Sequence, residues 1–294
     1  MDSASETIDH YRRRFLRTAA MTVATVQFGI TASAHAHARK TKNVLPHVAD
    51  KSDLAKMGTG VVLVHGAWAD GSGWDRVIAP LQSKGLKTMA APIPLTSLSD
   101  DAAALDWALD RTDGPVVLVA HAYSGAVVGA CHNERVRALV FITSLTPDEG
   151  ETVAEVFYRE KSEAPHLVPD GRGLLWIPDK QFHASWCQNA SPEEAALLAA
   201  TQRPIAVACI QEKAPTPAWR AKPSWYLVAE EDRMINPATQ LFLARRMGAR
   251  IQSEKVDHAA LITAPEVVIG VILQAVNSVN AARDKERSTN RQPG

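Results

Sequence analysis

A turn after one apolar run has the pattern of a catalytic turn, but alanine stands where a nucleophile is expected. Residues 116–120 are apolar and lead into His-Ala-Tyr-Ser-Gly at 121–125. In a nucleophile elbow a strand enters a sharp turn, the apex residue carries the attacking oxygen, and small residues stand two positions on either side. Ala122 occupies this apex, between Ala120 and Ser124. A methyl side chain cannot attack a carbonyl carbon.

The elements that would hold this turn alternate between short apolar runs and helical patterns. We expect strands at 61–64, 87–91, 116–120, 136–143, 225–229 and 251–256, and helices near 74–81, 99–109, 237 onward and 265–276. This alternation is typical of an α/β fold with a mostly parallel, doubly wound sheet covered on both faces. Residues 147–220 break the rhythm with several prolines and three tryptophans, so we expect an inserted cap there.

Four short motifs follow one another along this predicted sheet. They are His-Gly-Ala-Trp at 65–68, the turn around Ala122, Asp232 after a strand, and His258 within Val-Asp-His-Ala-Ala at 256–260. Their order resembles the α/β-hydrolase fold superfamily. The motifs are most similar to those of its small-cap esterase branch, which also contains plant hydroxynitrile lyases and methyl esterases. The resemblance implies a hydrolase-type domain over 58–280 with a small cap at about 147–220.

The resemblance assigns a chemical role to each motif. His258 would be the general base, and Asp232 would hold its tautomer and stabilise the imidazolium. The backbone amides of Ala67 and Tyr123 would form an oxyanion hole for a reacting carbonyl.

Three interpretations of the turn remain open. In the first, Ser124 is the nucleophile, because Ala122 and Ala126 then provide the small neighbours, although the hydroxyl moves by about 6–7 Å at 3.3 Å per residue. In the second, the apex stays at Ala122, and His258 activates a water or removes a substrate proton, as in a non-covalent hydrolase or a lyase. In the third, the chain is a non-catalytic small-molecule binder, an inactive relative, or a serine-to-alanine form of an ordinary esterase. The expected function is hydrolysis of a small, largely apolar ester or related carbonyl compound.

Composition favours a small-molecule partner. The chain has 294 residues, 46% of them hydrophobic, which is enough for one large core. Its 32 basic and 32 acidic residues balance, so we expect no nucleic-acid surface. Trp68 and Trp186 are candidates for an aromatic floor under an apolar substrate. No dinucleotide fingerprint, phosphate loop or metal-ligand spacing occurs, so we expect no cofactor and no metal.

Three cysteines are too few and too scattered for a disulfide framework or a zinc site. We expect Cys131, Cys187 and Cys209 to be buried as small apolar side chains. Pairing of Cys187 with Cys209 is left open for an exported chain.

Both ends of the chain differ in composition from the predicted domain. Residues 12–16 read Arg-Arg-Arg-Phe-Leu and precede an apolar run at 18–30 and small-residue cleavage sites at 32–36. We expect 1–38 to be a signal peptide read by the twin-arginine export machinery, 39–57 to be a polar linker, and the protein to be periplasmic or secreted, with no membrane span in its mature form. Residues 281–294 are rich in charge, Ser, Asn and Gln, so we expect a disordered tail.

Overall fold

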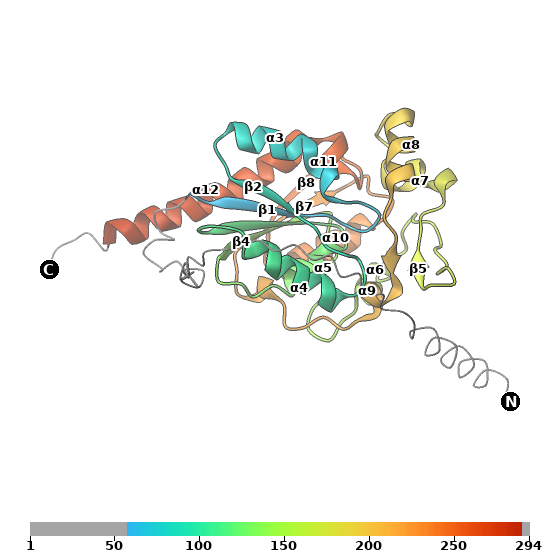
Figure 1. Cartoon of the computed structure of the whole chain (residues 1–294), viewed down its shortest axis with the longest axis horizontal. Helices are drawn as coiled ribbons and strands as arrows, with labels where there is room; N and C mark the ends of the chain where they lie inside the picture. Colours follow the sequence, from blue (N-terminus) through green and yellow to red (C-terminus); the bar gives the residue numbers. More distant parts are fainter. Residues whose placement is uncertain (1–57, 290–294) are drawn as a thin grey trace, which may run out of the picture. The chain divides into compact units, whose positions relative to one another are not determined.

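A six-stranded parallel sheet forms the centre of the computed structural model, which describes residues 58–289 (Figure 1). The strands are β1 (Gly60–Val64), β2 (Thr88–Ala91), β3 (Val116–His121), β4 (Val136–Ile142), β7 (Ser224–Ala229) and β8 (Arg250–Glu254). Their order is β2-β1-β3-β4-β7-β8, and every neighbouring pair is parallel. The apolar runs predicted these strands because the inner strands of such a sheet are buried on both faces. The predicted fold class is confirmed.

Right-handed crossovers distribute the helices over the two faces. The chain first steps outward from β1 to β2 through α3 (Asp75–Ser83), and then steps the other way through α4 (Leu98–Leu109), α5 (Ser124–Gly129) and α10 (Pro237–Arg246). Because both directions use the same hand of crossover, α3 lies on one face and the other three on the opposite face. The final helix α12 (Pro265–Thr289) returns to the face of α3 and packs against β3, β4 and β7 (Figure 1).

Local sequence signals explain where two of these helices begin. Asn236 accepts a hydrogen bond from the Ala238 amide, and Pro237 occupies the first turn of α10, as the sequence predicts. Helix α4 begins at Leu98, one residue before the predicted start at 99, and its N-cap is Ser97, whose Oγ accepts from the Asp100 amide (3.0 Å).

The predicted helix end at 276 and the predicted disorder from 281 are wrong for residues up to 289. Helix α12 continues to Thr289. Residues 277–289 contain neither glycine nor proline, and their Ala, Arg, Lys and Glu are good helix formers. The charged composition of this segment therefore did not mark the end of the helix. Buried Val279 and a hydrogen bond from Thr59 Oγ1 to Asn280 Oδ1 (2.6 Å) hold this extension to the domain. Residues 290–294 lie outside the described part.

Among residues 58–289, α12 alone has the length and apolar composition of a helix that could cross a membrane. Its buried side chains face the sheet: Val268, Val271, Ile272, Ala275, Val276 and Val279. Packing in the core therefore accounts for its apolar content.

The cap consists of short elements at one end of the sheet (Figure 1). They are α6 (Val153–Phe157), β5 (Leu174–Leu175), α7 (Asp179–Trp186), α8 (Pro192–Thr201), β6 (Ile205–Ala206) and α9 (Val207–Gln211). The short helix η2 (Ala218–Arg220) follows them in the chain and contacts α5. Strands β5 and β6 pair antiparallel with each other and do not join the main sheet. Two further short helices lie outside the cap. They are η1 (Gly71–Trp74), which comes after β1, and α11 (Ala260–Thr263), which comes after β8, and they contact each other.

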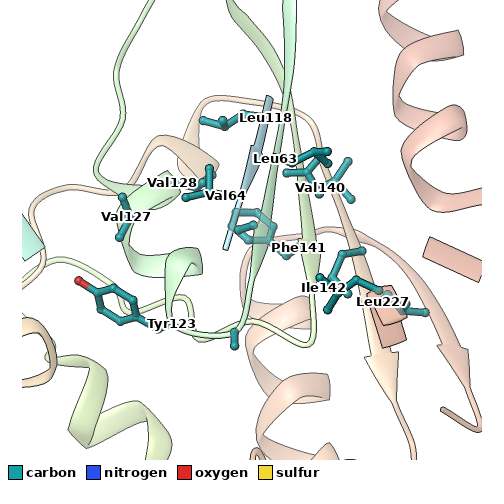
Figure 2. Close-up of a cluster of buried hydrophobic side chains, with 14 of the residues drawn as sticks. Leu63, Val64, Leu118, Tyr123, Val127, Val128, Val140, Phe141, Ile142 and Leu227 are labelled. Carbon is teal, nitrogen blue, oxygen red and sulfur yellow. The ribbon is translucent and has the colours of Figure 1, made fainter. Parts of the chain in front are cut away.

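A dense cluster of side chains fixes α5 to the sheet. Figure 2 shows Val128 of α5 beside apolar side chains of the sheet, while Val127 and Tyr123 lie on the side away from the strands; all three belong to the same buried cluster. Burying each such Val or Leu contributes about 1.5–3 kcal/mol. The strand-to-helix turn before α5 is thus held on a rigid base.

Two remaining sequence expectations concern the cysteines and the N-terminal segment. Cys131, Cys187 and Cys209 are buried, as expected, and none of them forms a disulfide within the described residues. The predicted signal peptide and linker, residues 1–57, lie outside the described part.

Candidate active site

The turn between β3 and α5 has the backbone of a nucleophile elbow with Ala122 at its apex. Ala122 has φ 52°, an uncommon conformation for a residue with a side chain. Its carbonyl accepts hydrogen bonds from the amides of Gly125 (3.1 Å) and Leu145 (2.9 Å). A Cβ on Gly125 would lie 2.4 Å from the Leu145 oxygen, so only glycine permits this close approach. The apex therefore stays at Ala122.

Ser124 lies beneath the apex and is not placed to attack a substrate. Its side chain is fully buried, its Oγ accepts from the His121 amide (2.9 Å), and it donates to the Val64 oxygen (2.8 Å) or the His121 oxygen (2.9 Å). Within the described residues it has no hydrogen bond to His258. The prediction of Ser124 as nucleophile is wrong, because β3 ends at His121 and Ser124 is already the first residue of α5.

His258 and Asp232 form a buried pair at the ends of neighbouring strands. Asp232 follows β7 and His258 follows β8, and these strands are parallel partners. His258 Nδ1 lies 2.9 Å from Asp232 Oδ2, and the side chains are 2% and 0% exposed. Because the carboxylate accepts the Nδ1 proton, the lone pair remains on Nε2, which has no partner among residues 58–289 and faces a pocket. The imidazole is thus arranged to act as a base.

Four donors orient the Asp232 carboxylate. Oδ1 accepts from the amides of Met234 (2.8 Å) and Ile235 (2.9 Å), and Oδ2 accepts from Gln240 Nε2 (2.8 Å) as well as from His258. Such saturation compensates for burying a charge.

Two aromatic residues support His258 from behind. His121 Nε2 donates to the His258 carbonyl oxygen (2.9 Å), and burial lowers the pKa of His121 to about 3, so this ring stays neutral. Trp186 packs edge-on against the His258 ring with centroids 6.0 Å apart. Trp186 does not line the pocket, so its predicted contact with substrate is wrong: α7 turns this side chain into the core.

The pocket in front of His258 has a volume of about 260 Å³ and is largely apolar. Its lining residues come from both the domain and the cap: Ala67, Trp68, Ala122, Tyr123, Leu145, Val153, Ala154, Phe157, Tyr158, Leu167, Pro169, Leu175, Ile205, Val207, Ile210, Gln211, Met234, Ile235 and His258. None of these is a serine, threonine, cysteine or charged residue. Trp68, predicted to contact substrate, lines the pocket, and its Nε1 donates to the Leu175 oxygen of the cap (3.0 Å).

Two backbone amides beside the apex have no protein acceptor within residues 58–289. They belong to Ala67, which follows β1, and to Tyr123, which precedes the first turn of α5. Both residues line the pocket together with Ala122 and His258. An oxygen between these amides would meet the arrangement of an oxyanion hole.

Comparison with known families matches residues 61–271 to the model of the "Alpha/beta hydrolase family". The chain belongs to this family. No curated protein sequence matches this α/β hydrolase.

Solved structures similar to this α/β hydrolase are esterase-like proteins. A polyneuridine aldehyde esterase is 18% identical, with a TM-score of 0.62 over 74% of this chain and 99% of that chain. The pyrethroid hydrolase from Sphingobium faniae JZ-2 is 18% identical, with a TM-score of 0.62 over 75% and 98%. An extracellular α/β-hydrolase from Paenibacillus species is 19% identical, with a TM-score of 0.64 over 74% and 99%. At identities this low, the structural similarity shows a shared fold and nothing more specific.

Sequence analysis did not single out the buried carboxylate of Asp101. Asp101 Oδ2 accepts from the Tyr123 hydroxyl (2.7 Å), and Oδ1 accepts from the Leu95 amide (2.7 Å). Burial raises the pKa of Asp101. The only sequence signal for Asp101 was its position in the first turn of a predicted helix. A carboxylate there is usually solvated and interacts with the helix dipole.

The Ser124→Ala variant is expected to lower stability and to leave turnover unchanged. Removing the hydroxyl leaves the buried His121 amide without its acceptor, which costs about 1–3 kcal/mol. Denaturant unfolding and ester hydrolysis on the same preparation measure both effects. The matched control is Ser144→Ala, another fully buried serine that donates to backbone oxygens. A loss of turnover with unchanged stability would restore Ser124 as the nucleophile.

Proposed function

We propose that this α/β hydrolase hydrolyses a small, largely apolar ester or related carbonyl compound without forming a covalent intermediate. One observation carries this proposal: the free Nε2 of His258 shares its pocket with Ala122, and no hydroxyl or thiol of the Ser, Thr or Cys type lines that pocket. The attacking oxygen is then a water molecule activated by His258.

The reaction follows from the arrangement of the base and the two amides. The substrate carbonyl oxygen binds the amides of Ala67 and Tyr123, and water lies between His258 Nε2 and the carbonyl carbon. His258 takes one proton while the remaining hydroxide oxygen bonds to the carbon, and the carbonyl electrons move onto the oxygen. Collapse of this tetrahedral intermediate breaks the bond to the alcohol, which receives the proton from His258. Asp232 stabilises the transient imidazolium.

The size and polarity of the pocket support this substrate class. A water molecule takes about 30 Å³ of liquid volume, so the pocket holds both water and a small substrate. Since its described lining carries no charged side chain, a charged substrate would lose hydration without a compensating partner.

Hydrolysis of short-chain aryl esters by the protein lacking residues 1–38, followed by intact-mass spectrometry during turnover, tests the proposal. We expect steady product release without a burst and no added acyl mass on the protein. An acyl adduct would indicate a covalent nucleophile. Tight ligand binding without turnover would identify a binder, and proton exchange at a substrate carbon without hydrolysis would identify a lyase.

We also propose that the protein is exported by the twin-arginine route and acts in the periplasm or outside the cell. The support is the sequence pattern at 12–16 with the apolar run that follows. Changing Arg12 and Arg13 to lysine is expected to retain the full-length chain in the cytoplasm, as measured by cell fractionation. A single Lys40→Arg change in the linker is the control. Export of the double variant at the normal level would contradict the proposal.

A further inference from the structure

The end of cap helix α7 contacts both loops that carry the His–Asp pair. Gln188 Nε2 donates to the Glu231 carbonyl oxygen (2.6 Å), and the Asn189 amide donates to Asp257 Oδ2 (2.9 Å). Glu231 immediately precedes Asp232, and Asp257 immediately precedes His258. Two consecutive residues of the cap thus hold the chain one residue before each member of the pair.

The contact at Asp257 is buried and fully hydrogen-bonded. The Asp257 side chain has no exposed surface, and its Oδ1 accepts from Thr263 Oγ1 (2.5 Å) while Oδ2 accepts from Asn189. A buried carboxylate is costly once a donor leaves. The position of Asn189 relative to the His258 loop is therefore strongly constrained.

Two further contacts from the same segment reach the pair. Trp186 packs edge-on against the His258 ring at an interplanar angle of 69°. Arg233 Nη1, on the loop of Asp232, donates to the Ala184 oxygen (3.1 Å). Residues 184–189 therefore touch the acid loop at two points and the histidine loop at two points.

We propose that residues 184–189 are a positioning clamp, through which the cap sets the hydrogen bond between His258 and Asp232. Both dyad residues lie on loops after strands, and beyond the strands one backbone hydrogen bond joins the two loops directly, from the Glu231 amide to the Val256 oxygen (3.1 Å). The clamp adds a second bridge between the loops from a third element and so restricts their relative orientation further. Its effect on the hydrogen bond is independent of the reaction, whereas its effect on turnover rests on the proposed function.

Proton NMR of the His258 Nδ1 proton tests the clamp directly. A proton shared with a carboxylate resonates far downfield, and its loss in His258→Gln assigns it. We expect Gln188→Ala to shift this resonance upfield or broaden it beyond detection. Asp257→Ala is expected to do the same, because it removes the acceptor of both the Asn189 backbone N–H and the Thr263 hydroxyl.

The matched control is Gln202→Ala. Gln202 is also a cap glutamine, and its side chain makes two hydrogen bonds, both to the backbone of Ile177 within the cap. Neither Gln202 nor Ile177 lines the pocket. We expect Gln202→Ala to leave the resonance unchanged. An unchanged resonance in both Gln188→Ala and Asp257→Ala would overturn the clamp.

Kinetics provide the second readout. We expect kcat of Gln188→Ala to fall about 10–100-fold with KM nearly unchanged, because the base is misplaced while the pocket lining is intact. A wild-type protein that hydrolyses no ester, with the resonance still moved by Gln188→Ala, would overturn the proposed function and support the clamp. A fall in kcat with an unmoved resonance would overturn the clamp alone.

Discussion

The His258→Ala variant is expected to lose ester hydrolysis by about 10²–10⁴-fold. Among the described residues, His258 is the only histidine that lines the pocket, and its Nε2 is free to act as a base. Ala122 has no hydroxyl that another base could activate. The variant cannot deprotonate water, so the loss falls on kcat more than on KM. Initial rates on the most reactive aryl ester, extended over several hours, give both parameters.

Two companion variants sharpen this result. Asp232→Asn is expected to lose a comparable factor, since an amide that donates to Nδ1 would place the histidine proton on Nε2 and remove the base. His132→Ala is the control, because His132 is exposed and bonds only to the Thr216 oxygen. Wild-type rates in His258→Ala would mean that the pair does not act on the substrate.

Ala122→Ser is expected to raise the hydrolysis rate about 100-fold or more and to change the mechanism. The apex backbone, the two free amides and the unpaired His258 Nε2 are already in place, so the added hydroxyl can attack and form an acyl-enzyme. Removing the serine of a complete triad costs far more than this factor in known enzymes, which leaves room for such a gain. Burst kinetics and an acyl adduct in the mass spectrum would record the change.

The control for this gain is Ala154→Ser. Ala154 also lines the pocket, but it lies on cap helix α6, away from the elbow. Its serine is expected to bring neither a burst nor an adduct. If Ala122→Ser also gave neither a burst nor an acyl adduct, the elbow and His258 would not be aligned for covalent catalysis. The site would then differ from that of a serine esterase by more than one missing hydroxyl.

The amino-acid sequence was sufficient for the sheet and for the order of the site motifs. Buried parallel strands read as continuous apolar runs, and such runs marked β1, β3, β4 and β7 within one or two residues. Strand order then brings Asp232 and His258 together, because residues that follow adjacent parallel strands emerge at the same edge of the sheet.

Sequence-based prediction was ambiguous where one short pattern is compatible with two structures. Both Ala122 and Ser124 satisfy the spacing of an apex, and only the hydrogen bonds of the Ala122 carbonyl to Gly125 and Leu145 decide between them. Composition likewise suggested disorder after residue 280, whereas contacts with the domain extend α12 to Thr289.

Residue types and their order along the chain thus determined the family, the sheet and the pairing of His258 with Asp232. Tertiary structure decided which residue stands at the apex, that Ser124 and Trp186 support the site from behind, and that Gln188 and Asn189 bridge the two loops. The physical reason is the range of the interactions. Strands and helices follow from local periodicity, but the cap meets the dyad loops through contacts between residues 43 and 68 positions apart, which no local pattern records.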